Sequence, residues 1–165
     1  MLCHGSPRNL FEKILPGHIE NKEIFADVAS KYILCGHTHR VANFTQYDKT
    51  VWNSGSVGCP LNGQSKAEFM ILHSKDNQWE VEFITLDYDV EAVIKEMREK
   101  SFYETAPFWT QVSEQLLRGG TVAHGTALNR AMELCQIKYG ECKWPMIPEE
   151  CWQQACEELL HTREA

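Results

Sequence analysis

The chain has 165 residues, a net charge of −7, and 43% hydrophobic against 24% charged residues. This composition is typical of a globular domain and excludes a disordered tail, a collagen-like fibre and a disulfide miniprotein. No stretch approaches the roughly 20 apolar residues that a membrane helix needs, and no signal peptide is visible, so we expect a cytoplasmic protein.

The first half of the chain predicts short strands separated by turns. Leu2 and Cys3 are typical of the end of a strand, and a turn with glycine and proline follows them. The apolar run at 32–35, stopped by Gly36, is typical of a buried strand. A short helical piece at 10–15, a helix at 22–30 and strands at 41–47, 50–53, 67–73 and 79–86 complete the elements predicted for this half.

After residue 86 the hydrophobic period changes to that of a helix. Asp89 is a suitable N-cap for a helix that runs to about Lys100. Three further helices are predicted at 107–117, 126–138 and 149–161, and two glycines at 119–120 end the first of these. We therefore expect a mixed α/β (α+β) protein in which strands come first and helices last.

Charge and cysteine content narrow the function classes. Residues 1–60 carry 6 basic and 5 acidic side chains, residues 61–120 carry 6 and 11, and residues 121–165 carry 4 and 7. Binding to a phosphate backbone needs a basic face, so this distribution excludes a nucleic-acid-binding surface. Seven cysteines without a C-x-x-C pair favour reduced thiols over a disulfide framework or zinc knuckle. Cys35 and Cys59 lie beside the motif described next and are the candidates for a nucleophilic thiol.

The strongest chemical signal is the sequence Cys-Gly-His-Thr-His at 35–39, at the end of the predicted buried strand. In extended backbone His37 and His39 would point the same way, and imidazole is a common ligand for transition metals. Gly36 would let the backbone approach closely, and a second histidine, His4, also follows an apolar segment. The three histidines predict part of a metal site, with a turn whose histidines bond to the backbone as the alternative.

Two other enzyme classes with an H-x-H motif can be tested against the residues that follow. A metallo-β-lactamase-type site needs H-x-H-x-D-H, whereas His39 is followed by Arg-Val-Ala. A histidine-triad nucleotide hydrolase needs a third alternating histidine, where this chain has Val41. The sequence excludes both.

Taken in order, the motifs resemble those of the calcineurin-like metallophosphoesterases. Gly-His-Thr-His at 36–39 matches the last motif of that family, and His-Gly at 4–5 matches the single-histidine motif before it. Asn-Ser-Gly-Ser-Val-Gly at 53–58 resembles the Asn-Pro-Gly-Ser-Val-Gly stretch of the small bacterial phosphodiesterase branch, and Asp-Tyr-Asp at 87–89 before a helix also resembles that branch. The resemblance covers about residues 1–118, and residues 119–165 are expected to form a helical extension of unknown role.

The resemblance implies a fold, a cofactor and a reaction. The fold would be part of a four-layer α-β-β-α sandwich of two mixed sheets. His4 and His37 would bind one divalent metal and His39 another, and imidazole ligands suit Mn, Fe, Zn or Ni. The metals would clamp phosphate oxygens and activate a water molecule. The substrate would be a phosphorylated small molecule or another phosphoester.

Three further residues are candidates at this site. Arg8 follows the His4 turn and would suit a substrate phosphate, with a surface arginine as the alternative. Asn53 and Ser56 would hydrogen-bond around the metal-binding histidines, with plain turn residues as the alternative.

The N-terminal motifs of the family, Asp-x-His, Gly-Asp and Gly-Asn-His, are absent from this chain. We therefore expect the C-terminal part of a metal-dependent enzyme that hydrolyses a phosphomonoester or phosphodiester. The alternatives are a non-catalytic module that retains at most one metal, and a split enzyme completed by another polypeptide. The sequence indicates no membrane partner and leaves a homo-oligomer open.

Overall fold

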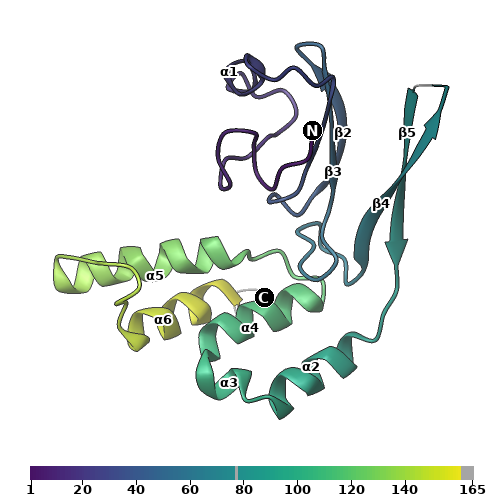
Figure 1. Ribbon diagram of the computed structural model, residues 1–165. Helices are drawn as coiled ribbons and strands as arrows, with labels where there is room; N and C mark the ends of the chain where they lie inside the picture. The colour runs from purple at the N-terminus through teal and green to yellow at the C-terminus, as the bar shows by residue number, and fades with distance from the viewer. Residues whose placement is uncertain (77, 161–165) are drawn as a thin grey trace. The chain divides into compact units, whose positions relative to one another are not determined.

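The computed structural model describes residues 1–76 and 78–160 (Figure 1). They form two compact units, which are described separately below. The first holds Met1–Asn62 and Lys66–Tyr88, and the second holds Gly63–Ser65 and the residues from Asp89 onward. The units divide at residue 88, whereas the family-like portion is predicted to end at 118, and the extents of that portion and of the helical extension stay predictions.

The first unit is built on a three-stranded mixed sheet. Its strands are β1 (Tyr32–Cys35), β2 (Val41–Gln46) and β3 (Lys49–Ser54), in the order β1-β3-β2. β1 is parallel to β3, and β2 pairs with β3 in the antiparallel sense. The N-terminus continues the sheet, because Leu2 forms a parallel bridge with Leu34. The residue after Cys3 is therefore placed beside the end of β1.

Aliphatic side chains at the centre of this sheet make the core of the first unit. Ile33 on β1 and Val51 on β3 are register partners, and both are fully buried. The short helix α1 (Asn21–Phe25) adds Ile24 and Phe25 to the same cluster. β-Branched residues suit such a position because they pack well on a pleated surface.

The second sheet is a long antiparallel hairpin, β4 (Ala67–Lys75) and β5 (Gln78–Leu86), whose register pairs Ala67 with Leu86. The hairpin belongs to the first unit. Two sheets with helices confirm the predicted mixed α/β class.

The second unit is helical. Asp89 caps its first helix, as predicted, because its carboxylate accepts a hydrogen bond of 2.9 Å from the Ala92 amide. None of the helices in residues 1–76 and 78–160 is long and apolar enough to cross a membrane. The helices are α2 (Val90–Glu99), α3 (Phe102–Thr105), α4 (Pro107–Leu117), α5 (His124–Tyr139) and α6 (Glu149–Leu160).

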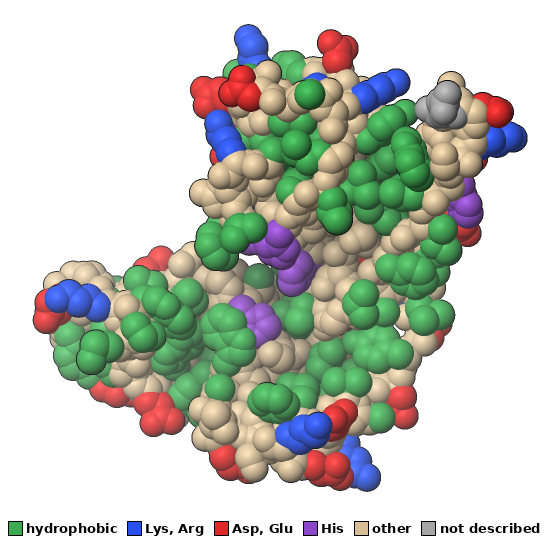
Figure 2. All heavy atoms as spheres, viewed as in Figure 1, with side chains coloured by type: hydrophobic (Ala, Val, Ile, Leu, Met, Phe, Trp, Pro, Cys, Tyr) green, Lys and Arg blue, Asp and Glu red, His purple; other side chains and the backbone are tan. Residues whose placement is uncertain are grey.

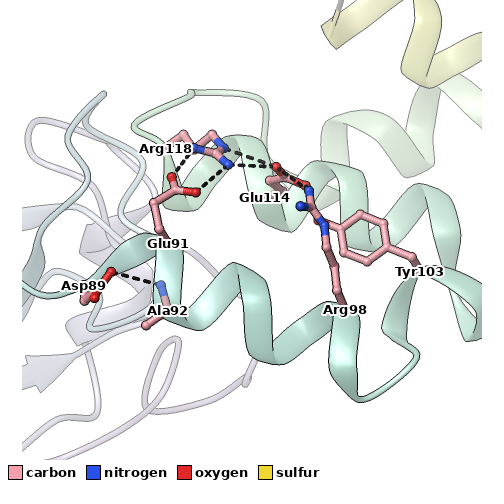
Figure 3. Close-up of polar contacts among 7 residues, drawn as sticks. All are labelled: Asp89, Glu91, Ala92, Arg98, Tyr103, Glu114 and Arg118. Atoms are coloured by element: carbon pink, nitrogen blue, oxygen red, sulfur yellow. Dashed lines mark hydrogen bonds and ion pairs between the residues drawn. The ribbon is translucent and has the colours of Figure 1, made fainter.

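Small side chains pack α5 against α6, and charged side chains connect α2 with α4. Ala131 on α5 and Ala155 on α6 are fully buried in one cluster. Figure 3 shows Glu114 of α4 between Arg98 and Arg118, with the Tyr103 hydroxyl also donating to it. Burial alone would raise the pKa of Glu114, but the bonds from Tyr103 and Arg118 and the charge of Arg98 outweigh it and lower the pKa.

Two predicted helices need correction, and one short helix was missed. The helical piece predicted at 10–15 is wrong: residues 10–11 form a turn, and the Pro at position 16 disfavours helical backbone in the residue before it. The helix predicted at 22–30 ends at Phe25, because the Val28 amide bonds to the Phe25 carbonyl and closes a turn. The short helix α3 was not predicted, since four residues carry too little periodicity to be recognised.

Candidate functional site

Two backbone segments that lie side by side carry the predicted metal-binding histidines. The Gly36 amide, just after β1, donates a 2.8 Å hydrogen bond to the carbonyl of His4. This bond continues the pairing of the N-terminal segment with β1 by one step. A Cβ at Gly36 would lie 3.7 Å from the His4 carbonyl oxygen, an ordinary contact, so the approach does not require glycine as the sequence suggested.

The imidazoles of His4 and His37 are neighbours. Their ring centroids are 5.2 Å apart with an edge-to-face angle of 64°. Figure 2 shows histidine side chains side by side at the surface of the first unit. Burial lowers the pKa of His37, and the nearby charges of His4, Lys13 and His39 lower it further. A lowered pKa keeps the imidazole neutral, which is the form that binds a metal.

His39 takes a different geometry from the predicted one. His37 and His39 have φ angles of 57° and 53°, so the backbone is left-handed rather than extended at both positions. The rule that residues i and i+2 share a face therefore does not apply here. Nδ1 of His39 lies 2.9 Å from the Cys59 carbonyl oxygen. Because a carbonyl can only accept, Nδ1 carries a proton, and the neutral ring in this tautomer has its lone pair, which a metal requires, on Nε2.

Asn53 and Ser56 hold the loops that carry the histidines, and their bonds go to backbone and hydroxyl groups. Asn53 is 1% exposed, its Nδ2 donates to the Gly36 carbonyl and to Oγ1 of Thr38, and its Oδ1 accepts from the Gly55 amide. Oγ of Ser56 accepts from the Cys59 amide at 3.0 Å. Ser56 thereby shapes the turn whose carbonyl orients the His39 ring.

The guanidinium of Arg8 is engaged by a carboxylate. Nε and Nη2 of Arg8 donate to both oxygens of Glu12 at 2.7–3.0 Å, and Glu12 also accepts from the Ser6 hydroxyl. A substrate phosphate at Arg8 would compete with this bidentate pair, so the role of Arg8 stays a prediction.

Neither cysteine beside the motif has the properties of a nucleophile. All seven cysteines are free, in agreement with reduced thiols. Burial raises the pKa of Cys35 to about 12, with a contribution from Cys3, and burial also raises the pKa of Cys59. A thiol with a raised pKa contains little thiolate at neutral pH, and the thiolate is the reactive form.

Sequence reasoning missed Phe11 and the Cys59 carbonyl as parts of this site. The Phe11 ring lies 6.2 Å from the His37 ring, although Phe11 is 78% exposed. Neither residue carries a local signal, because one lies in a segment with no helix or strand and the other acts through its backbone.

The donors fit an imidazole-rich part of a coordination sphere. His4 and His37 offer adjacent rings, and His39 offers a defined lone pair. Borderline divalent metals such as Mn, Fe, Zn and Ni accept such ligands. Within the described part of the chain, no three histidine, cysteine or acidic side chains are arranged to hold a metal ion together.

Comparison with known proteins yields distant relatives. No family model matches the chain. An uncharacterized protein of Methanocaldococcus jannaschii is 25% identical over 136 residues, which cover 72% of this chain and 51% of that protein. Two solved structures are similar: a hypothetical protein from Pyrococcus horikoshii OT3 (TM-score 0.57, 22% identity, 74% of this chain, 46% of that one) and a metallophosphoesterase from Sphaerobacter thermophilus (TM-score 0.58, 24% identity, 72% and 54%).

The chain spans about half the length of the relatives that it matches. At identities of 22% and 24%, the likeness to the solved structures concerns the fold alone. The predicted architecture is confirmed at that level. The chain shares its mixed α/β fold with the metallophosphoesterase from Sphaerobacter thermophilus.

Proposed function

We propose that this chain supplies the histidine-bearing part of a metal-dependent phosphoesterase of the small phosphodiesterase branch. The observation that carries the proposal is the pairing of His4 and His37, whose rings are 5.2 Å apart on two segments joined by a backbone hydrogen bond. The two imidazoles that meet here come from residues 33 places apart in sequence. The fold shared with a metallophosphoesterase from Sphaerobacter thermophilus supports the same reaction class.

The residues of this chain would have distinct tasks. His4 and His37 would hold one divalent cation, and His39 would offer Nε2 to a second. When bound, such cations polarise a phosphate ester and lower the pKa of a water molecule. The Cys59 carbonyl fixes the tautomer of His39, and Asn53 fixes the backbone that carries His37 and His39. The substrate would be a phosphorylated small molecule with a phosphomonoester or phosphodiester group.

The test compares metal binding and turnover in single-residue variants. We expect His4→Ala and His37→Ala each to weaken Mn²⁺ binding by at least the roughly 10- to 100-fold that the loss of an outer-shell partner costs, measured by calorimetry and elemental analysis. Hydrolysis of bis-p-nitrophenyl phosphate in the presence of Mn²⁺ should fall with it. His73→Ala is the matched control, because His73 lies on β4 and contacts Glu82. Unchanged metal content in both variants would refute the proposal.

One observation favours a second function. Among residues 1–76 and 78–160, no carboxylate completes a metal-binding group with the histidines. A protein without offsetting carboxylates would hold at most one cation and would not catalyse hydrolysis. Metal binding that depends on His4 and His37 without any turnover would indicate this non-catalytic module. Copurification with a chain that restores turnover would instead indicate a split enzyme.

A further inference from the structure

The second unit contains a pocket walled by aromatic side chains. It lies between the start of α4, the loop before α6 and the first turn of α6, and its volume is about 360 Å³. That volume falls in the range of pockets that take small ligands. The lining residues that matter here are Phe108, Trp109, Trp144, Ile147, Glu149 and Trp152.

Two of the tryptophans form a corner. The rings of Trp109 and Trp152 have centroids 6.2 Å apart and lie at 76° to each other. Trp109 is supported from another side by His124, at a centroid distance of 4.4 Å, and Nε2 of His124 contacts Oγ of Ser113 at 2.8 Å. The Trp109 ring is therefore positioned by contacts with Trp152 and His124 that need no ligand.

The aromatic surface of this pocket is open to solvent. Trp144 is 59% exposed and Trp109 is 41% exposed. A concave surface lined by accessible aromatic rings can take a small ligand. The aliphatic side chain of Ile147, which is 9% exposed, adds a further apolar surface to the pocket.

The charges at the pocket favour a cation. Glu149 is an exposed carboxylate at the rim, and none of the residues that line the pocket is lysine or arginine. Residues 89–160 carry 12 acidic and 7 basic side chains, so their overall field also attracts cations. The faces of tryptophan rings carry partial negative charge and attract cations more strongly than other aromatic rings do.

We propose that this pocket binds a small organic cation with a quaternary ammonium group. Methyl groups on the nitrogen suit the apolar and aromatic walls, whereas a primary ammonium is strongly hydrated and would meet only one carboxylate, that of Glu149, among the lining side chains. An anionic ligand is disfavoured by Glu149. The inference does not depend on the proposed phosphoesterase activity.

The experiment uses choline as the probe and 3,3-dimethyl-1-butanol as its neutral isostere. Calorimetric titration at constant ionic strength should show saturable binding of choline, tighter than that of the isostere by about tenfold. Equal affinity for the two compounds would show an apolar pocket without cation selectivity. The absence of saturable choline binding would also overturn the proposal.

Three variants link the binding to these residues. Trp144→Leu and Glu149→Gln should each weaken choline binding several-fold, and both side chains are exposed, so the fold should persist in circular dichroism spectra. Trp79→Leu removes a tryptophan that is 45% exposed on β5 and should leave choline binding unchanged. Equal choline affinity in all three variants would place the binding elsewhere and refute the assignment.

Discussion

The two units of this protein both rely on buried apolar side chains, but they differ in how these pack and in the chemistry that they carry. In the first, buried aliphatic side chains such as Ile33 and Val51 hold a sheet together, and loops at its edge present the histidines. In the second, small residues such as Ala131 and Ala155 bring helices together, and an aromatic pocket opens at their ends.

The comparison shows where each unit places its polar groups. In the first unit a buried side chain, Asn53, serves the backbone of the histidine loops. In the second unit Glu114 lies between two arginines and joins helices (Figure 3). Buried hydrogen bonds to a backbone are costly to lose, whereas partly exposed ion pairs are weak. We expect substitutions of these polar side chains to differ accordingly in the two units.

The largest effects are expected from the two hydrophobic centres, which should be equally sensitive. Ile33→Ala on β1 and Leu116→Ala on α4 should each lower the free energy of unfolding by about 2–5 kcal/mol, because both side chains are fully buried. The exposed controls Ile71→Ala and Ile137→Ala should cost less than about 1 kcal/mol. Urea denaturation, monitored by hydrogen exchange at individual residues, measures the free energy of unfolding for the buried and the exposed variants. If Ile33→Ala behaved like Ile71→Ala, the described core of the first unit would be wrong.

Two glycines in the first unit share a backbone angle and differ in their surroundings. Gly55 and Gly17 have φ angles of 79° and 78°, but a Cβ at Gly55 would lie 2.8 Å from Cβ of Glu68 and 2.9 Å from Cγ2 of Val41. Gly17→Ala should cost about 1–2 kcal/mol from the backbone alone. Gly55→Ala should cost about 1–3 kcal/mol more, because the site is overpacked. Equal losses in thermal denaturation would contradict the packing described around Gly55.

Asn53 should matter more than a surface asparagine on the neighbouring strand. Asn53→Ala should cost about 1–3 kcal/mol, because it removes the acceptor of the buried Gly55 amide and the side-chain donor to the Gly36 carbonyl. Asn43→Ala removes an exposed acceptor for Nε1 of Trp52 and should cost about 0.5–1.5 kcal/mol. Denaturant unfolding compares the two variants. A smaller loss for Asn53→Ala than for Asn43→Ala would contradict the role given to Asn53.

The smallest effect is expected at Glu114, and it depends on pH. The folded pKa of Glu114 lies below its usual value, so its contribution to stability is present above the unfolded pKa and disappears as the pH falls through the folded pKa. Glu114→Gln should cost less than about 1 kcal/mol at pH 7 and nothing at pH 2. Glu104→Gln on α3 is the control for the loss of one carboxylate. Unfolding curves at several pH values would contradict the ion pair if Glu114→Gln lost the same stability at pH 2 as at pH 7.

Hydrophobic periodicity predicted most elements of both units, because periods of two and of 3.6 residues are local properties. It identified β1 from four apolar residues, and the N-cap at Asp89 from one side chain and the apolar stripe that follows it. It failed at 10–15, where a proline follows, and at α3, which is too short to show a period. Local sequence patterns predict a helix or strand correctly only where the segment is long enough to show a period and adopts the structure that its residues favour.

The spacing of the histidines indicated that they would gather, and the order of strands and helices indicated the fold class. Tertiary structure decided how the rings are presented. His37 and His39 have left-handed backbone, and the rings and loops are oriented by bonds between residues 15 or more positions apart: His39 to the Cys59 carbonyl, and Asn53 to Gly36 and Thr38. Such contacts form only when the sheet brings distant segments together, and no local pattern records them.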